Sequence, residues 1–148
     1  MKKIVILSII FVASVVTSCV KDFEYTIPLA VDNIERTWPK NGANLEDPVD
    51  YVKITSSGTW EAKIIPAKEG ETWCYIKDHY LDKKGVQHKV ATITEYYEGT
   101  DLGCKARATG TVWLPIHYTR TGTNRYATLI VRRVDGVDCE VVMRITQK

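Results

Sequence analysis

The chain has 148 residues, with 20 lysines and arginines against 18 aspartates and glutamates. Two of the lysines fall within the first 18 residues, so the remainder carries no net side-chain charge. Nucleic-acid-binding proteins usually present a basic excess on one face, so this balance argues against a nucleic-acid partner. Residues 19–148 have about the length of one domain, which is enough to bury a core.

Residues 1–18 have the layout of a secretory signal peptide. Lys2 and Lys3 form a cationic start, and residues 4–16 are an apolar run shorter than the about 20 residues that cross a bilayer. The run ends on Val16-Thr17-Ser18-Cys19, which resembles the lipobox of bacterial lipoproteins. The resemblance implies that Cys19 is lipidated and becomes the first residue of the mature protein. The alternative is ordinary secretion with an incidental cysteine.

Acyl chains on Cys19 would attach the protein to a membrane, since each buried methylene contributes about 0.8 kcal/mol. We therefore expect a lipid-anchored protein of the outer membrane. Lys21, followed by Asp22 and Glu24, resembles the signal that sends lipoproteins of Bacteroidota to the cell surface. We expect exposure at the cell surface, with a periplasm-facing anchor and a plain solvated tether as alternatives.

The first predicted strand lies close behind the anchor. Every second position of residues 23–31 is apolar, which is the period of a half-buried strand. Pro28 cannot donate a hydrogen bond to a ladder, so we expect an edge strand. Residues 19–44 are therefore assigned to a lipid-anchored tether and this first edge strand.

The middle of the chain holds shorter runs. Alternating residues at 52–54 and 60–64 flank a Ser-Ser-Gly turn, and a short strand is expected at 73–76. A turn with two lysines and a glycine leads into a β-branched stretch at 86–97. The glycines of residues 98–110 predict a loop.

The last third alternates most clearly. Apolar positions recur at every second residue of 112–118, 127–131 and 139–145, and Asp135-Gly136 suits a type I′ turn. No run has a helical period. Seven or eight short strands with regular turns predict an all-β fold, a β-sandwich.

Four segments, taken in order, resemble one known family. They are ITSSGTW at 54–60, Trp73, GTNRYATLI at 122–130, and MRITQ at 143–147. They resemble the BACON domain of Bacteroidota, an immunoglobulin-like β-sandwich, and this implies a carbohydrate-binding domain over residues 45–148.

The chain departs from the family pattern in two places. No asparagine opens the glycine turn near residues 119–121, and the stretch between Trp73 and that turn is longer than the family's. We assign the excess, about residues 77–109, to an inserted hairpin followed by a loop.

Glycan binding, which the resemblance implies, would need exposed aromatic faces. If the apolar residues of 112–116 point inward, Trp113 and His117 point outward on the same strand. Trp38 lies in a Pro/Gly loop, and Tyr96 and Tyr97 end the insertion. We expect Trp113, Trp38 and one of the tyrosines to form a stacking platform, with His117 beside it. The alternative is that Trp38 folds back over the sandwich end and Trp113 packs under the insertion.

Two other tryptophans are expected in the core. Trp60 and Trp73 each begin an alternating strand, where a large ring can fill the space between two sheets.

Three cysteines remain besides Cys19, and at most one pair of them can form a disulfide. Cys74, Cys104 and Cys139 match no zinc-ligand spacing, so we expect no metal and favour burial as small apolar residues. Cys139 is placed inward, and Cys74, next to inward Trp73, outward. Cys74 with Cys104 is the pair expected if a bridge forms.

Catalysis has no motif to support it. His79, His88 and His117 lie on separate segments, and the adjacency of Asp78 and His79 does not orient a triad. We expect a non-catalytic envelope lipoprotein without cofactor that binds a glycan. The alternative is an assembly or spacer module that packs on another envelope protein through an open sheet edge. Surface aromatics gathered on one face would favour the glycan; dispersed or buried ones would favour assembly.

Overall fold

The computed structural model describes residues 27–42 and 48–148, and in this part of the chain the protein is all-β. The signal peptide and Cys19 lie outside the described residues. The strands are β1 (Leu29–Val31), β2 (Glu35–Trp38), β3 (Val49–Ser56), β4 (Thr59–Pro66), β5 (Cys74–Ile76), β6 (His79–Leu81), β7 (Gln87–Lys89), β8 (Thr92–Tyr96), β9 (Gly103–Thr109), β10 (Val112–Tyr118), β11 (Arg125–Arg133) and β12 (Glu140–Gln147). Among the described residues, no helix is long and apolar enough to cross a membrane.

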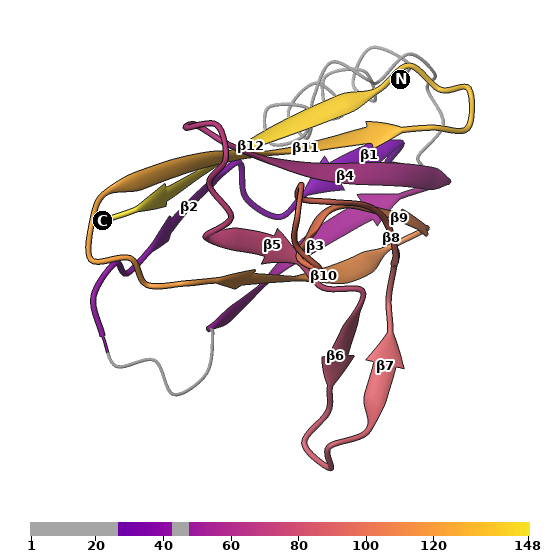
Figure 1. Ribbon diagram of the computed structural model, residues 1–148. Coiled ribbons are helices and arrows are strands. Elements are labelled where there is room, and N and C mark those ends of the chain that lie inside the picture. Colours follow the sequence, from indigo (N-terminus) through magenta and orange to yellow (C-terminus); the bar gives the residue numbers. More distant parts are fainter. Residues whose placement is uncertain (1–26, 43–47) are drawn as a thin grey trace.

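One curled sheet makes both layers of the sandwich. Its strand order is β1-β3-β10-β5-β9-β4-β11-β12-β2, with β8 paired to β9 beside this path. Between β5 and β9 only Ile76 and Gly103 are paired, so the sheet folds over at that junction. β3 and β10 then lie in one layer, opposite β4, β11 and β12 in the other (Figure 1). The expected all-β sandwich is confirmed.

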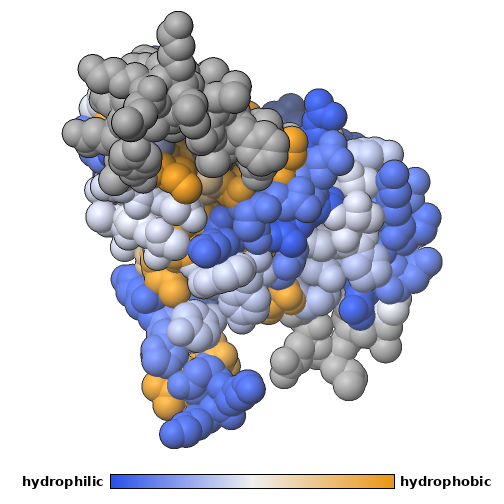
Figure 2. Space-filling model, turned by 180° about the vertical axis from the view of Figure 1, so that it is seen from behind, coloured by the Kyte–Doolittle hydropathy of each residue, from blue (hydrophilic) through white to orange (hydrophobic). Residues whose placement is uncertain are grey.

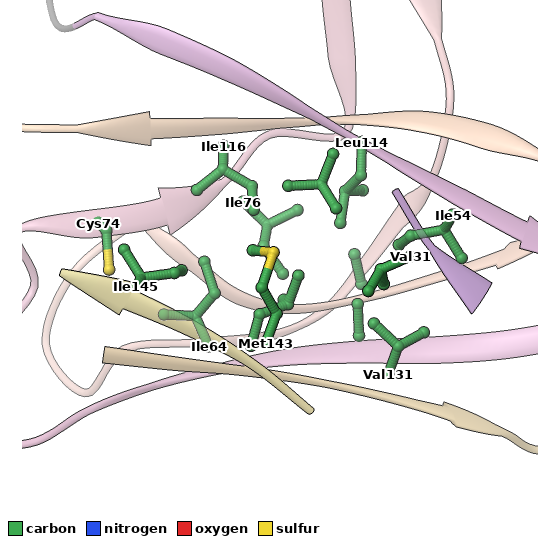
Figure 3. Packing of buried hydrophobic residues seen from close by; sticks show 14 of the residues in the cluster. Val31, Ile54, Ile64, Cys74, Ile76, Leu114, Ile116, Val131, Met143 and Ile145 are labelled. Atoms are coloured by element: carbon green, nitrogen blue, oxygen red, sulfur yellow. The ribbon is translucent and has the colours of Figure 1, made fainter. Parts of the chain in front are cut away.

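The core lies between the two layers. Alternate residues of β3 and β10 face alternate residues of β4, β11 and β12, and Figure 3 shows Leu114 and Ile116 opposite Ile64 and Val131. Trp60 is fully buried, and its indole Nε1 donates to the carbonyl of Gly110 at 2.8 Å. Trp73 is 5% exposed, so both expected core tryptophans are confirmed.

The described residues contain twelve strands, more than the seven or eight that the sequence predicts. The stretch at 86–97 is divided into β7 and β8, and β2 adds an edge at one end of the sheet order. β6 belongs to the inserted hairpin, and β9 is a seven-residue strand where a loop was expected. β1 lies at one end of the sheet order, as expected for the edge strand predicted within residues 23–31, but among the described residues this strand begins only at Leu29, after Pro28.

The inserted hairpin is present as β6 and β7, which form a two-stranded sheet of their own. It projects from the sandwich (Figure 1), and the space-filling view shows apolar side chains among its charged ones (Figure 2). Its turn is closed by a hydrogen bond from the Asp82 amide to the Val86 carbonyl at 3.0 Å. Gly85 has a φ of 77°, which glycine adopts without strain.

The loop predicted for residues 98–110 is wrong, because residues 103–109 form β9 in the main sheet. Gly103 breaks no strand; a Cβ there would lie 2.8 Å from the Ile76 carbonyl oxygen and 2.8 Å from the Ile93 side chain. Glycine inside a strand often marks such a close approach. The inward residues that follow, Cys104 and Ala106, are small, so their alternation is weak in the sequence.

The outward placement of Cys74 is also wrong. β5 begins at Cys74, after Trp73, so the Cys74 and Ile76 side chains face the core (Figure 3) and Tyr75 takes the other face. Cys74 and Cys104 are buried free thiols, so the pair expected if a bridge forms is not joined. Burial raises the pKa of the Cys74 thiol to about 12.

Candidate functional site

The outer face of the layer that holds β3, β10 and β5 carries a row of ring side chains. Successive side chains of a strand alternate between faces, so the inward Leu114 and Ile116 leave Trp113, Pro115 and His117 outward. The ladder sets Pro115 beside Tyr51 of β3 and His117 beside Tyr75 of β5. Residues distant in the sequence thus share one patch of surface.

A cleft of about 440 Å³ opens on this face where the base of the hairpin meets the sheet. Its ring-bearing walls come from three segments of the chain: Tyr51 of β3, His117 and Pro115 of β10, and the stretch from β5 into β6 that contributes Tyr75, His79 and Tyr80. The insertion therefore supplies one wall of the cleft.

The rings of the cleft hold one another in place. Tyr75 and His117 stack with centroids 5.4 Å apart and planes at 21°. Tyr80 meets Tyr51 edge to face at 6.4 Å, and its own ring stacks on His88 at 5.0 Å. Such aromatic pairs contribute about 0.5–1.5 kcal/mol beyond their buried area. The Tyr51–Tyr80 contact joins the hairpin to the sheet, so it fixes the width of the cleft.

Polar groups at the hairpin base are oriented by short hydrogen bonds. The Lys77 amide donates to the Pro115 carbonyl at 3.0 Å, which ties the start of the insertion to β10. The Asp78 carboxylate lies 2.8 Å from Nδ1 of His79 and fixes that imidazole. The cleft thus combines ring faces with an ammonium group and imidazole nitrogens, a set suited to binding a polar ligand that has apolar faces.

At the far end of the hairpin, Nε2 of His88 lies 3.0 Å from the Asp82 carboxylate. This bond, with those from the Val86 and Lys84 amides, lowers the pKa of Asp82. Among the described residues, no group of three or more histidine, cysteine, aspartate or glutamate side chains is arranged to hold a metal ion.

Two of the residues predicted for the platform point outward as expected. Trp113 is 51% exposed, and the Lys53 ammonium lies 5.7 Å from its ring centroid. His117 lies in the cleft itself. The cross-strand pairs Trp113–Lys53 and Pro115–Tyr51 follow one another along the ladder, so Trp113 extends the ring-bearing face beyond the cleft.

The two tyrosines that end the insertion separate. Tyr96 is 55% exposed and lines a second depression, of about 290 Å³, which shares Tyr75, Lys77 and His79 with the cleft. Tyr97 is half-buried, and its hydroxyl donates to the Cys74 carbonyl at 2.8 Å. Burial raises the pKa of Tyr97, and its hydroxyl is bound within the fold.

The expected exposure of Trp38 is wrong. Trp38 is the last residue of β2 and only 4% exposed. Its ring stacks on Tyr118 at 4.5 Å and meets Trp73 edge to face at 6.0 Å, and its Nε1 donates to Asp50 at 2.8 Å. Trp38 therefore folds over the end of the sandwich, as the alternative had it, and does not join Trp113 in a platform.

Sequence reasoning missed Tyr51, Tyr75 and Tyr80. Tyr51 could have been found, because the inward Val52 and Ile54 place residues 51 and 53 outward on the same strand. Tyr75 was hidden by the wrong register of β5. Tyr80 reaches the cleft only because the hairpin packs on β3, a contact that local sequence does not encode.

Comparison with known proteins gives few matches. No family model and no curated protein matches the chain. Among solved structures, it is similar to the ASH/PapD-like domain 7 of human CEP192, with 8% identity, a TM-score of 0.41, and 83% of this chain and 85% of that chain covered. It is also similar to WR4, a Caenorhabditis elegans MSP family member, with 11% identity, a TM-score of 0.38, and coverage of 81% and 97%. What this chain binds has to be inferred from its own residues.

Proposed function

We propose that the protein is a non-catalytic, lipid-anchored envelope protein that binds glycans in the cleft between the hairpin and the sheet. The observation that carries the proposal is the convergence of Tyr51, Tyr75, Tyr80 and His117 on one cleft. The C–H faces of sugar rings stack on aromatic faces, while neighbouring polar groups bind the hydroxyls. The BACON-like segments of the sequence point to the same ligand class.

The ligand of this surface is an oligosaccharide rather than a single sugar. From His117 to Trp113 the strand extends about 13 Å, at about 3.3 Å per residue. Trp113 is exposed at the far end of this distance and has the Lys53 ammonium over its ring. A glycan chain seated in the cleft could therefore continue along β10 and stack on Trp113.

The anchoring part of the proposal depends on the lipobox-like Val16-Thr17-Ser18-Cys19. Acyl chains on Cys19 would hold the sandwich at the outer membrane, and the acidic residues after Lys21 favour the cell surface. A binding domain held there would meet polysaccharides from the surroundings.

The alternative, an assembly module, is favoured by open strand edges in the described part of the chain, those of β1 and β2 at the two ends of the sheet order and that of β8. Among the described residues β8 pairs only with β9, so its other edge is open to strand addition. However, the β8–β9 ladder is interrupted between Ile93 and Glu95 and again between Glu95 and Tyr96. Such irregularities protect an edge against pairing with another chain. The ring-lined cleft is therefore the better candidate for the binding surface.

The test is a glycan array, followed by pull-down on insoluble polysaccharides, with the purified mature protein. We expect at least one hit that Tyr80→Ala and Tyr51→Ala weaken, because binding energy concentrates in a few anchors. Tyr126→Ala is the matched control, since Tyr126 is 51% exposed on β11 in the other layer. Absence of binding across the whole panel, together with a co-purifying envelope protein, would favour the assembly module instead.

A further inference from the structure

The described lining of the cleft holds one ammonium group, that of Lys77, and no carboxylate. His79 and His117 add two imidazoles. The two neighbouring depressions differ in this respect. Asp78 and Asp101 line the depression beside Tyr96, and Glu71 lines the one beside Trp73.

Carboxylates close to the cleft are already engaged. Asp78 is bound to Nδ1 of His79 at 2.8 Å, and Asp82 to Nε2 of His88 at 3.0 Å. Asp50 neighbours Tyr51 in β3, yet its carboxylate accepts from the indole of Trp38 at 2.8 Å and lies 3.8 Å from Nε of Arg36. None of these three carboxylates is in an ion pair with Lys77.

Lys77 makes no ion pair with a described residue, whereas Lys63 and Lys105 on the other side of the sheet fold do. Lys63 lies 3.4 Å from Glu95, and Lys105 lies 3.2 Å from Glu61. The Lys77 amide donates to the Pro115 carbonyl, and the half-buried Lys77 side chain lines the cleft. Lys53, over Trp113, adds a second lysine with no ion pair to a described residue on the same face.

We propose that the glycan bound in the cleft is an acidic one, carrying carboxylate or sulfate groups that pair with Lys77. This inference rests on the proposed function, because it names the class of glycan for the same site. An ammonium paired with an anionic oxygen makes a charge-assisted hydrogen bond, about twice as strong as a neutral one. Ring faces would bind the sugar, and Lys77 would select its charge.

The test uses matched pairs of polysaccharides that differ in charge alone. They are polygalacturonate and its methyl ester, alginate and its carboxyl-reduced form, and carrageenan and its desulfated form. Affinity electrophoresis of the mature protein against each member measures binding, and the three pairs distinguish carboxylate from sulfate. Three variants are compared with the wild type: Lys77→Gln, Tyr80→Ala, and Lys84→Gln, which removes the same charge from the exposed tip of the hairpin.

We expect wild-type protein to bind the acidic member of at least one pair more tightly than its neutral counterpart. Loss of one hydrogen bond to a charged group should make Lys77→Gln weaker toward that acidic member by about tenfold. Lys84→Gln should bind like the wild type, and Tyr80→Ala should lose affinity for both members of the pair.

Two results would overturn the inference and leave the proposed function standing. One is equal binding of the acidic and neutral members, and the other is an equal loss in Lys77→Gln and Lys84→Gln. A third result, no binding to any member of any pair or to any neutral glycan of the array, would overturn both the inference and the proposed function.

Discussion

The ring of Trp38 is fixed by three contacts, a stack on Tyr118, an edge-to-face contact with Trp73 and a hydrogen bond to Asp50. The ring of Trp113 lies under the Lys53 ammonium, and about half of the residue's surface is in solvent. The same residue type therefore has two roles in this chain. Trp38 closes the end of the core, and Trp113 remains available to a ligand.

This difference predicts that substitution by alanine lowers the melting temperature at Trp38 but not at Trp113. Truncating a buried large aromatic usually costs about 3–5 kcal/mol, so Trp38→Ala should lower the melting temperature by about 10 °C or more. Trp60→Ala and Trp73→Ala should act in the same direction. Trp113→Ala should leave the melting temperature nearly unchanged and weaken only glycan binding. Thermal denaturation followed by circular dichroism measures all four, and equal shifts would show that the faces are misassigned.

A second prediction at this scale concerns Asp135, whose carboxylate accepts from buried Arg133 at 2.6 Å and from the Thr59 amide at 3.1 Å. The bond to Arg133 is the main reason that the pKa of Asp135 falls from 3.8 to about 2. A lowered folded-state pKa adds stability above the ordinary pKa, and this stability is lost as the pH falls through the folded-state value. The melting temperature should therefore decline as the pH falls from 3.8 toward about 2.

Asp135→Asn is the control for this titration. The variant should be less stable than the wild type at neutral pH, because the Arg133 guanidinium loses its charged partner. The gap should narrow as the pH approaches about 2, where the wild-type carboxyl is protonated. A gap of constant size across this range would show that Asp135 acts through its shape and not through its charge.

At the scale of elements, the β6–β7 hairpin forms a sheet separate from the sandwich on which it packs. Among the described residues β6 and β7 pair only with each other, and the contacts of Tyr80 with Tyr51 and of Lys77 with Pro115 join this part of the chain to the sheet. The scaffold and the cleft wall can therefore be changed independently, as with a binding loop on a rigid sheet.

This separation predicts that shortening the hairpin removes binding but not folding. Replacing residues 80–88 by Asn-Gly keeps His79 and Lys89, which are paired in the hairpin, and joins them by a two-residue turn. The melting temperature should stay close to that of the wild type, because no core residue is removed, and glycan binding should be lost. Tyr126→Ala again serves as the control. Full binding by the shortened protein would place the ligand elsewhere.

The strands differ in how well the sequence alone predicts them. The long strands β10, β11 and β12 carry apolar side chains at every second position over most of their length, so their inward faces were predictable. β9 was not, because its inward residues are small and its first residue is a glycine in contact with backbone. The cleft was half predictable: His117 and Trp113 follow from the alternation of β10, whereas Tyr80 depends on tertiary packing of the insertion. A Pro/Gly stretch after Trp38 indicates where a strand ends, not whether its last ring is exposed.

At the scale of the whole molecule, the proposal assigns glycan binding to the sandwich and membrane attachment to the N-terminal segment. The core closes between two layers of one sheet, and the binding face lies outside it, on β3, β10 and β5. A domain of this kind can work at a membrane without spanning it, provided that acyl chains hold its N-terminal end. A substitution that abolishes membrane attachment should then leave glycan binding intact, and the reverse should also hold.

Cys19→Ala tests this division. Without the thiol no diacylglyceryl group can be attached, so the variant should lose labelling by radioactive palmitate and move from the membrane fraction to the soluble one. Several acyl chains, at about 0.8 kcal/mol per buried methylene, hold a protein far more firmly than surface contacts do, so the wild type should withstand a high-salt wash. The released variant should bind glycan as the wild type does, because the cleft residues are unchanged. A Cys19→Ala protein that remained in the membranes after the salt wash would contradict lipid anchoring at this residue and point to attachment through another part of the chain.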